Sequence, residues 1–529
     1  MPSEYSYEDT PRLVMDSGKI TRISMVKEGT RIKLNRRQFL KNKTLALLAL
    51  AASPWSLFAA ARKRPPNILW IYIEDQDPRH GCYGERLVNT PNIDALAQEG
   101  TLFERAYVPS PVCSPCRSAI ITGSYAVRLG IHNQRSSRDP SAAIHLPEGL
   151  KTVPEVFRNA GYFTFNRGKD DYNFMYDRSK LYSTGNRPKV SGKAAGGKGK
   201  GAGIVQVGGG DWRECPKDIP FFAQYQLSGG KHAHSKDMAA RLTKAGVTAI
   251  DPNDVTVPPQ YPDTAAIRYE IARHLDTMHL TDHEVGQMVT RLKADGLWEN
   301  TVIFLFSDHG SYMPRSKQFC YEEGLHVPFM VVAPGMKETV QPGTVRRELT
   351  GVLDVAATSL ALAGVAIPDY MDARNLFAKG TGRGYLYATR DRCEWAIDRI
   401  RSVMGERYHY IRNFMTDRPL WQHNYRMDWP FIKEIEQMYK SGELTPAQAA
   451  PFAKRVKEEL YDLQNDPHEV RNLAGDPEHR ETLSKMNGLM QAWIEETGDK
   501  GQYPISKAEL RAVKNRYGKL CISPEFQSL

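Results

Sequence analysis

The residues with the clearest capacity for chemistry lie in segment 113–123, which begins Cys-Ser-Pro-Cys-Arg and ends Thr-Gly. A cysteine in a loop can be a small buried hydrophobe, one member of a redox pair, or a metal ligand. Cys113 and Cys116 have the spacing of a redox pair, but the neighbouring Pro115 and Arg117 argue against that interpretation. The sequence also has no second cysteine pair at the spacing of a zinc site. The segment therefore singles out Cys113, with an arginine four residues after it.

This segment resembles the motif by which type I sulfatases mark one cysteine for oxidation to formylglycine. The resemblance implies that a maturation enzyme converts Cys113 to an aldehyde, and that one hydroxyl of the hydrated aldehyde attacks a sulfate ester at sulfur. The second hydroxyl then releases sulfate and restores the aldehyde. Such chemistry needs a cation to stabilise the attacking oxygen, basic groups to hold the sulfate oxygens, and an acid for the leaving group.

Two polar pairs that follow apolar runs can supply the cation site. The runs 67–73 and 301–306 are typical of buried parallel strands, and the residues after them include Glu74-Asp75 and Asp308-His309. Ligands in doubly wound sheets bind beyond the carboxyl ends of the strands, so both pairs should converge there. Carboxylate oxygens with one imidazole favour Ca²⁺, or Mg²⁺ as the alternative, over zinc.

The sulfatase family usually has Asp-Asp after the first of these strands and Asp-Asn or Asp-His after the later one. His309 follows the second pattern, whereas Glu74 departs from the first, and its role as a direct ligand stays open. The resemblance implies a metal site made of Glu74, Asp75, Cys113, Asp308 and His309.

Three basic residues match the positions at which the family binds sulfate. Arg117 follows Cys113 by four residues, so the two side chains stand one turn apart if the segment opens a helix. Lys169 matches the family's Gly-Lys after the next strand, and Lys317 lies four residues before Tyr321 at the spacing of the second lysine. The family often continues Gly-Lys-Trp-His, but this chain has Asp170-Asp171 after Lys169.

The leaving-group acid is expected after the apolar strand 220–227. The following segment contains His232 and His234, near the place where the family has a histidine. Histidine donates a proton near neutral pH more readily than lysine or arginine does. His232 is the first candidate by its position, and His234 remains possible. Both are also predicted to contact the substrate.

The family resemblance implies an alkaline-phosphatase-like α/β fold. This fold has a mostly parallel central sheet with helices on both faces and a smaller C-terminal α+β subdomain with an antiparallel sheet. We expect a catalytic domain over residues 62–393 and the C-terminal subdomain over 394–529. An amphipathic helix is predicted for 264–295, and alternating polar and apolar residues predict a hairpin over 400–414. The seven cysteines are scattered, and no disulfide framework is expected.

The first 61 residues form an N-terminal extension with the features of a twin-arginine signal peptide. Arg36-Arg37 precedes an apolar stretch over 44–60, and small residues at 59–61 offer a cleavage point. This stretch is too short for a stable membrane span, although an uncleaved anchor is the alternative. The pattern predicts export through the twin-arginine route to the periplasm or the medium.

The formal net charge of +10 suits a polyanionic partner. The Gly- and Lys-rich segment 187–210 carries part of this charge and is predicted to be a flexible loop near the substrate entrance. No nucleic-acid recognition module accompanies the charge, so nucleic acid is not expected as a partner. The sequence leaves the oligomeric state open.

Together these features predict a sulfuric ester hydrolase that acts on a sulfated glycan, with resemblance to enzymes that act on algal galactans such as carrageenan. Two alternatives stay open. Phosphonate and phosphodiester hydrolases share the expected fold and sometimes the formylglycine motif. An inactive glycan-binding homologue would also fit if Cys113 remained a thiol.

Overall fold

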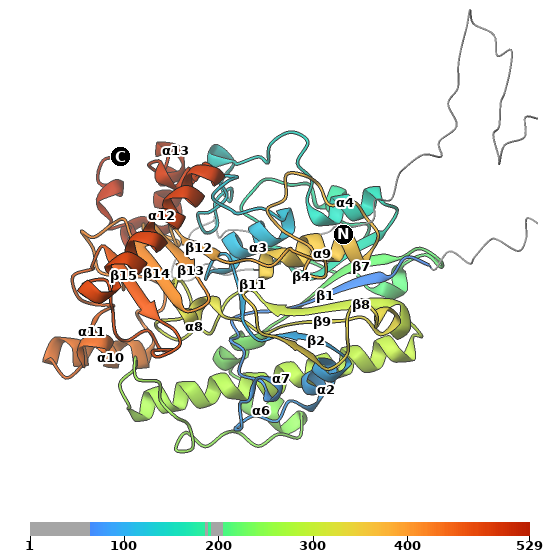
Figure 1. Cartoon of the computed structure of the whole chain (residues 1–529), viewed down its shortest axis with the longest axis horizontal. Helices are drawn as coiled ribbons and strands as arrows, with labels where there is room; N and C mark the ends of the chain where they lie inside the picture. The colour runs from blue at the N-terminus through green and yellow to red at the C-terminus, as the bar shows by residue number, and fades with distance from the viewer. Residues whose placement is uncertain (1–63, 186–188, 192–204) are drawn as a thin grey trace, which may run out of the picture. The chain divides into compact units, whose positions relative to one another are not determined.

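The computed structural model describes residues 64–185, 189–191 and 205–529. Its main feature is a nine-stranded sheet in the order β10-β2-β9-β8-β1-β7-β4-β6-β5 (Figure 1). Every strand except β6 and β9 runs in the same direction, which confirms the predicted mostly parallel sheet. The strands are β1 (Asn67–Ile73), β2 (Gly100–Phe103), β4 (Phe163–Lys169), β5 (Lys189–Ser191), β6 (Val205–Gly208), β7 (Phe221–Leu227), β8 (Thr301–Ser307), β9 (Phe329–Val332) and β10 (Thr344–Arg346).

The central strands are apolar on both faces because helices cover both faces of the sheet. All seven residues of β1 are buried, and they enter two separate cores in alternation. Trp70 belongs to one core, and its neighbour Ile71 belongs to the other. Figure 1 shows one helical layer on each side of the sheet. One layer contains α2 (Pro91–Glu99), α6 (Met238–Lys244) and α7 (Ala265–Ala294), and the other contains α3 (Cys113–Thr122), α4 (Val153–Asn159) and α9 (Val355–Leu362).

A second, four-stranded antiparallel sheet follows in the C-terminal part, as predicted. It consists of β12 (Leu386–Arg390), β13 (Ile400–Met404), β14 (Tyr408–Asn413) and β15 (Glu458–Asp462). The pair β13–β14 is the expected hairpin. The predicted boundary at residue 393 falls between β12 and β13, so this sheet includes a strand from the sequence assigned to the catalytic domain. The helices that follow are α12 (Arg480–Thr497) and α13 (Lys507–Tyr517).

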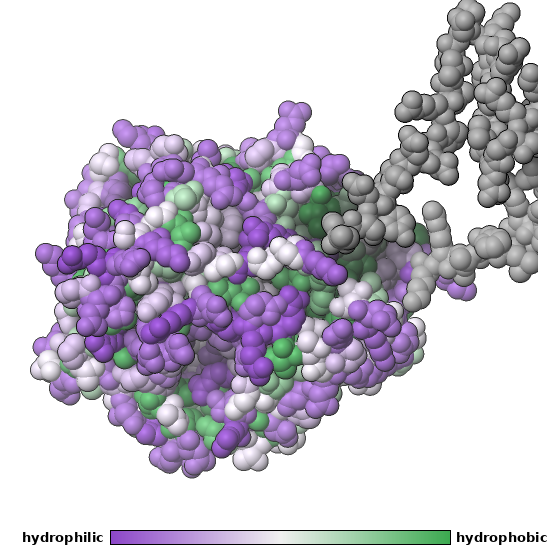
Figure 2. Space-filling model, in the orientation of Figure 1, coloured by the Kyte–Doolittle hydropathy of each residue, from purple (hydrophilic) through white to green (hydrophobic). Residues whose placement is uncertain are grey.

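Short elements complete the described chain. The strands β3 (Ala106–Tyr107) and β11 (Thr350–Gly351) form a small parallel pair. The remaining helices are α5 (Arg178–Leu181), α8 (Glu322–Leu325), α10 (Pro430–Ser441) and α11 (Pro446–Ala449). Figure 2 shows a mainly hydrophilic face on which hydrophobic residues occur in small groups.

Several predictions concern regions at the margins of this fold. The twin-arginine segment lies outside the described residues. Part of segment 187–210 is described, and there β5 and β6 pair as antiparallel strands beside β4. All seven cysteines are free thiols, in agreement with the absence of a disulfide framework. Among the described helices, none combines the length and hydropathy that a membrane span requires.

Candidate active site

The site is built where β1 and β8 end side by side. The two strands pair in parallel with Ile73 opposite Ser307, so the residues that follow them meet at one edge of the sheet. The backbone N–H of Asp75 donates a hydrogen bond to Asp308 Oδ1 over 3.1 Å. Both carboxylates are buried. The predicted convergence of the two polar pairs is therefore confirmed.

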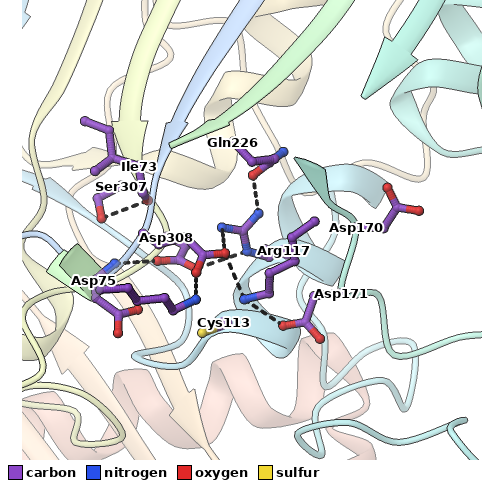
Figure 3. Close-up of polar contacts among 12 residues, drawn as sticks. Ile73, Asp75, Cys113, Arg117, Asp170, Asp171, Gln226, Ser307 and Asp308 are labelled. Atoms are coloured by element: carbon purple, nitrogen blue, oxygen red, sulfur yellow. Dashed lines mark hydrogen bonds and ion pairs between the residues drawn. The ribbon is translucent and has the colours of Figure 1, made fainter. Parts of the chain in front are cut away.

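Four of the five predicted metal ligands form one buried group. One ligand atom from each of Asp75, Cys113, Asp308 and His309 lies within 4.8 Å of the others. Figure 3 shows Cys113 beside the two aspartates. Asp75 Oδ1 is buried without a hydrogen-bond partner, which is the state of an oxygen that has room for a cation. The group fits a metal ion with mainly oxygen ligands.

His309 is oriented as a metal ligand. Its Nδ1 lies 2.9 Å from the carbonyl oxygen of Gly310, and since a carbonyl only accepts, Nδ1 carries the proton. The lone pair of Nε2 is then directed toward Cys113 Sγ, 3.2 Å away. Burial lowers the pKa of His309 to about 4, so the imidazole is neutral at physiological pH and free to coordinate.

Glu74, the fifth predicted ligand, lies outside this group. Its Oε1 lies 3.0 Å from Arg117 and 2.9 Å from Lys169, and its Oε2 contacts Lys231. The carboxylate therefore gathers three basic side chains at the site. Burial lowers the pKa of one of them, Lys231, to about 7.

The helix α3 positions Cys113 and Arg117 together, as the sequence predicted. Cys113 is the first residue of α3, and Arg117 lies one turn later. Pro115 is tolerated because the first-turn N–H groups of a helix have no partner within the helix. Those free N–H groups and the helix dipole favour an anion at this end. The sequence thus places the candidate nucleophile where a negative charge is stabilised.

Arg117 links the helix to the sheet. Its guanidinium donates to Asp308 Oδ2 over 3.0 Å and to Gln226 Oε1 over 2.5 Å, as Figure 3 shows. It also lies over the ring of Tyr72, 4.2 Å from the ring centroid. Burial alone would lower the pKa of Arg117, but the charge of Asp308 raises it above its ordinary value. The guanidinium is therefore a permanent cation.

The electrostatic environment makes Cys113 a poor nucleophile as a thiol. Burial raises its pKa, and the charges of Lys169 and Lys317 offset this effect in part. A thiol with a raised pKa stays protonated and unreactive at neutral pH.

The two predicted sulfate-binding lysines both reach the site. Lys317 Nζ lies 2.6 Å from Asp75 Oδ2. Lys169, at the end of β4, lies 3.0 Å from Asp171 Oδ2. Asp171 occupies the position at which the family motif predicts a histidine. In place of a histidine, this chain has a carboxylate there, which forms the ion pair with Lys169. Asp75 and Asp171 both have positive φ angles, of 56° and 60°, which is backbone strain typical of functional sites.

The two histidines predicted as acids lie in the 3-10 segment η4 (Gly229–His234) after β7. His232 is buried, and its Nε2 lies 3.2 Å from Glu284 Oε1 on α7. His234 packs against the rings of Tyr312 and Trp429. It lies close enough to Asp75 and Lys317 for their charges to act on it.

Lys231 is a site residue that the sequence analysis missed. It contacts Glu74 from the segment after β7, and this approach depends on two glycines. Gly230 donates to the carbonyl of Glu74 over 2.7 Å, and a Cβ at Gly230 would overlap the carbonyl oxygen of Asp75. The Gly-Gly pair one residue after a sheet strand was the available signal, because it permits a close backbone approach.

Comparison with known proteins agrees with this geometry. Residues 66–365 match the sulfatase family model, and residues 308–450 match the model described as N-sulphoglucosamine sulphohydrolase, C-terminal. An ulvan-active sulfatase of Formosa agariphila is 27% identical over 489 residues, which cover 84% of this chain and 77% of that protein. The human N-sulphoglucosamine sulphohydrolase is 24% identical over 484 residues, which cover 83% and 91% of the two chains.

A solved structure shows the same fold. The crystal structure of Ps i-CgsB in complex with k-i-k-neocarrahexaose has a TM-score of 0.57 at 18% identity, and the match covers 86% of this chain and 98% of that one. The sulfatase model matches more than half of this chain. The protein is therefore a member of the sulfatase family, with the alkaline-phosphatase-like fold that its sequence predicted.

Proposed function

We propose that the enzyme removes sulfate from a sulfated polysaccharide or oligosaccharide, with formylglycine derived from Cys113 as its nucleophile. One observation carries the proposal: Cys113 Sγ belongs to the buried ligand group and lies at the start of a helix beside several cationic side chains. The hydrate of the aldehyde would supply the hydroxyl that attacks the sulfate ester.

We propose Ca²⁺ as the bound ion, with Mg²⁺ as the alternative. Asp75, Asp308, His309 and the side chain at position 113 would hold it, and three of these four groups offer oxygen once Cys113 is converted. When bound, the ion would lower the pKa of the nucleophilic hydroxyl and stabilise its negative charge.

The protein's own residues would hold the sulfate group and the proton. Arg117, Lys169 and Lys317 would neutralise the sulfate oxygens, and Lys231 joins them from the segment after β7. Glu74 would keep Arg117, Lys169 and Lys231 together between turnovers. For the leaving-group acid we propose a histidine of the segment after β7, either His232 or His234. His232 pairs with Glu284. His234 lies near Asp75 and Lys317, but burial lowers its pKa to about 4, so its imidazole is neutral at pH 7.

The substrate proposal rests on the sequence and on the relatives. The sequence favours an algal galactan such as carrageenan, and one relative acts on ulvan by its name. A panel of sulfated oligosaccharides from carrageenan, ulvan and glycosaminoglycans, assayed for released inorganic sulfate, tests the proposal. Release from at least one of them supports it, and its absence from all of them with fully converted enzyme contradicts it.

The same assay separates a sulfatase from a phosphonate hydrolase. A sulfate ester and a phosphonate monoester with the same alcohol are compared on one enzyme preparation. We expect kcat/KM to be larger for the sulfate ester. A larger value for the phosphonate would favour the alternative function.

We also propose export through the twin-arginine route, on the basis of residues 35–61. Conversion of Cys113 would then precede translocation, since that route carries folded proteins. Replacement of Arg36 and Arg37 by lysine should cause the precursor to accumulate in the cytoplasm of a bacterial host. Undiminished export of this variant would contradict the proposal.

A further inference from the structure

Aromatic side chains from three parts of the chain meet in one cluster. The ring centroid of Trp429, which precedes α10, lies 4.4 Å from that of His234 and 5.9 Å from that of Tyr312. Tyr425 lies beside Trp429, with 6.1 Å between their ring centroids. His234 follows β7, Tyr312 follows β8, and the other two residues belong to the C-terminal part. The cluster is therefore assembled by the tertiary fold.

This cluster is fastened to the segment that carries Lys317. Arg426 is fully buried, and its guanidinium donates to the carbonyl oxygen of Lys317 over 2.9 Å and to that of Tyr312 over 3.0 Å. The backbone N–H of Trp429 donates to the carbonyl oxygen of Arg426 over 2.9 Å. Burial raises the pKa of Tyr425, and the charge of nearby Lys317 opposes this effect. Trp429 and Tyr425 are therefore held beside a lysine that we propose to bind sulfate.

The cluster also reaches the side from which solvent approaches the site. His234 remains partly exposed, yet it is close enough to the buried Asp75 for the charge of that carboxylate to act on it. The side chain of Lys231 is 38% exposed, although it contacts the buried Glu74. These two basic side chains therefore mark the entrance to the site. Trp429 packs on His234 and is itself only partly buried.

An indole at this position is suited to the sugar ring that carries the sulfate group. A pyranose presents C–H groups on its face, and an aromatic ring offers them a flat apolar surface. Sites for small ligands combine such surfaces with a few polar groups that fix the orientation. The hydrogen bonds of Arg426 hold the aromatic segment in place before the substrate arrives, which lowers the entropic cost of binding.

We propose that Trp429, with Tyr425 beside it, binds the apolar face of the pyranose ring whose sulfate group is removed. The proposal rests on the function proposed above and assigns recognition of the sugar ring to the C-terminal part of the chain. Two tasks are then separate: the basic residues of the catalytic domain hold the sulfate group, and the aromatic residues hold the sugar. Loss of an aromatic ring should weaken binding of the sugar and leave binding of sulfate unchanged.

Calorimetric titration in the presence of Ca²⁺ tests this role separately from turnover. The Cys113→Ala protein serves as the parent, because it lacks the proposed nucleophile. The probes are the monosulfates of galactose, N-acetylglucosamine and rhamnose, and inorganic sulfate is the matched probe without a sugar. Trp429→Leu and Tyr425→Leu keep an apolar side chain but remove the ring. Tyr503→Leu is the control, because it alters a tyrosine that is 62% exposed.

We expect at least one sugar monosulfate to bind the parent more tightly than inorganic sulfate does. Trp429→Leu should weaken that binding about tenfold, and Tyr425→Leu should weaken it by a smaller factor, because contact with an aromatic ring is lost. Trp429→Phe keeps a ring and should retain most of the affinity. Tyr503→Leu should bind as the parent does. The affinity for inorganic sulfate should be the same in all of these proteins.

Three results would overturn the proposal. In the first, no sugar monosulfate binds the parent more tightly than inorganic sulfate, and in the second, Trp429→Leu binds as tightly as the parent. In the third, the affinity for inorganic sulfate falls by the same factor as that for the sugar, which would mean that Trp429 only supports the structure of the site. Thermal unfolding shows whether each variant is folded, and if Trp429→Leu is not, Tyr425→Leu is judged by the same criteria.

Sulfate release by the converted wild-type enzyme is measured in parallel on the oligosaccharide panel. Release of sulfate together with unchanged binding by Trp429→Leu would contradict this inference alone. Binding that depends on the aromatic ring, without release of sulfate from any member of the panel, would contradict the proposed function alone.

Discussion

Arg117 and Asp308, which are 191 positions apart in the sequence, are joined by an ion pair of 3.0 Å between Nε and Oδ2. Arg117 lies on the helix that begins with Cys113, and Asp308 follows the strand β8. Both side chains are almost fully buried. The pair therefore fixes the distance between the candidate nucleophile and one of the metal ligands.

The first prediction concerns this ion pair. Arg117→Met should lower sulfate release by roughly 10³-fold, because it removes a cation from the reacting group. It should also lower the free energy of unfolding by about 3–5 kcal/mol, since Glu74 and Asp308 lose a buried partner. Kinetics and chemical denaturation measure the two effects. Arg241→Met breaks an exposed ion pair with Asp237 and should change neither quantity appreciably.

A second prediction follows from the close packing at Gly230. In Gly230→Ala the new methyl group would overlap the carbonyl oxygen of Asp75, so the backbone of both segments must shift. We expect metal content and sulfate release to fall together. Elemental analysis of the purified protein gives the metal content. Gly382→Ala is the matched control, because a Cβ there meets no atom within 4 Å. A Gly230→Ala protein with full metal content would show that metal binding does not need the close approach of Gly230 to Asp75.

Metal removal gives a third prediction. A chelator should lower both the activity and the midpoint of thermal unfolding, because an ion that binds the native state stabilises it. Addition of Ca²⁺ should restore both at a lower concentration than Mg²⁺ does. In Asp308→Asn, the midpoint of thermal unfolding should no longer respond to the chelator or to added Ca²⁺. An unchanged midpoint in the wild-type protein after complete chelation would contradict the assignment of the ligand group.

The free energy of unfolding should change with pH partly through the carboxyl group of Asp398, in the C-terminal part of the chain. Burial alone would raise the pKa of Asp398, but the nearby charges of Arg390 and Arg455 bring it below its ordinary value. In the unfolded chain the pKa of an aspartate is about 4. Because folding lowers the pKa of Asp398, its ionised carboxylate stabilises the fold above that pH, and this stabilisation is lost as the pH falls further.

Asp398→Asn leaves two buried arginines without their partner and should cost about 3–5 kcal/mol at pH 7. The difference between this variant and the wild type should shrink when the pH is lowered from 5 to 3. Thermal unfolding at a series of pH values measures it. A difference that stays constant over this range would show that the pKa of Asp398 is not lowered by folding.

Much of the fold and the ligand group could be predicted from local sequence. Apolar runs such as 67–73 identify buried parallel strands, and such strands deliver the residues after them to one edge of the sheet. This rule was enough to bring Asp75 and Asp308 together. It does not specify which way a side chain points in the turn that follows, so Glu74 was grouped with the ligands although it contacts cations.

The remaining site residues depend on tertiary structure. Lys231 and His232 are neighbours in one short 3-10 segment, yet Lys231 contacts Glu74 and His232 contacts Glu284. Arg135, Arg138, Arg392 and Arg516 line one small hollow, although no periodicity connects them in the sequence. Their proximity results from the docking of α13 against the loop after α3.

The central claim is that Cys113, once converted to formylglycine, is the nucleophile of a sulfatase. The most direct measurement combines peptide mass spectrometry of residue 113 with the rate of sulfate release by the same preparation. We predict that release is proportional to the converted fraction and that Cys113→Ala, although folded, releases no sulfate. Release by Cys113→Ala at the wild-type rate would contradict it.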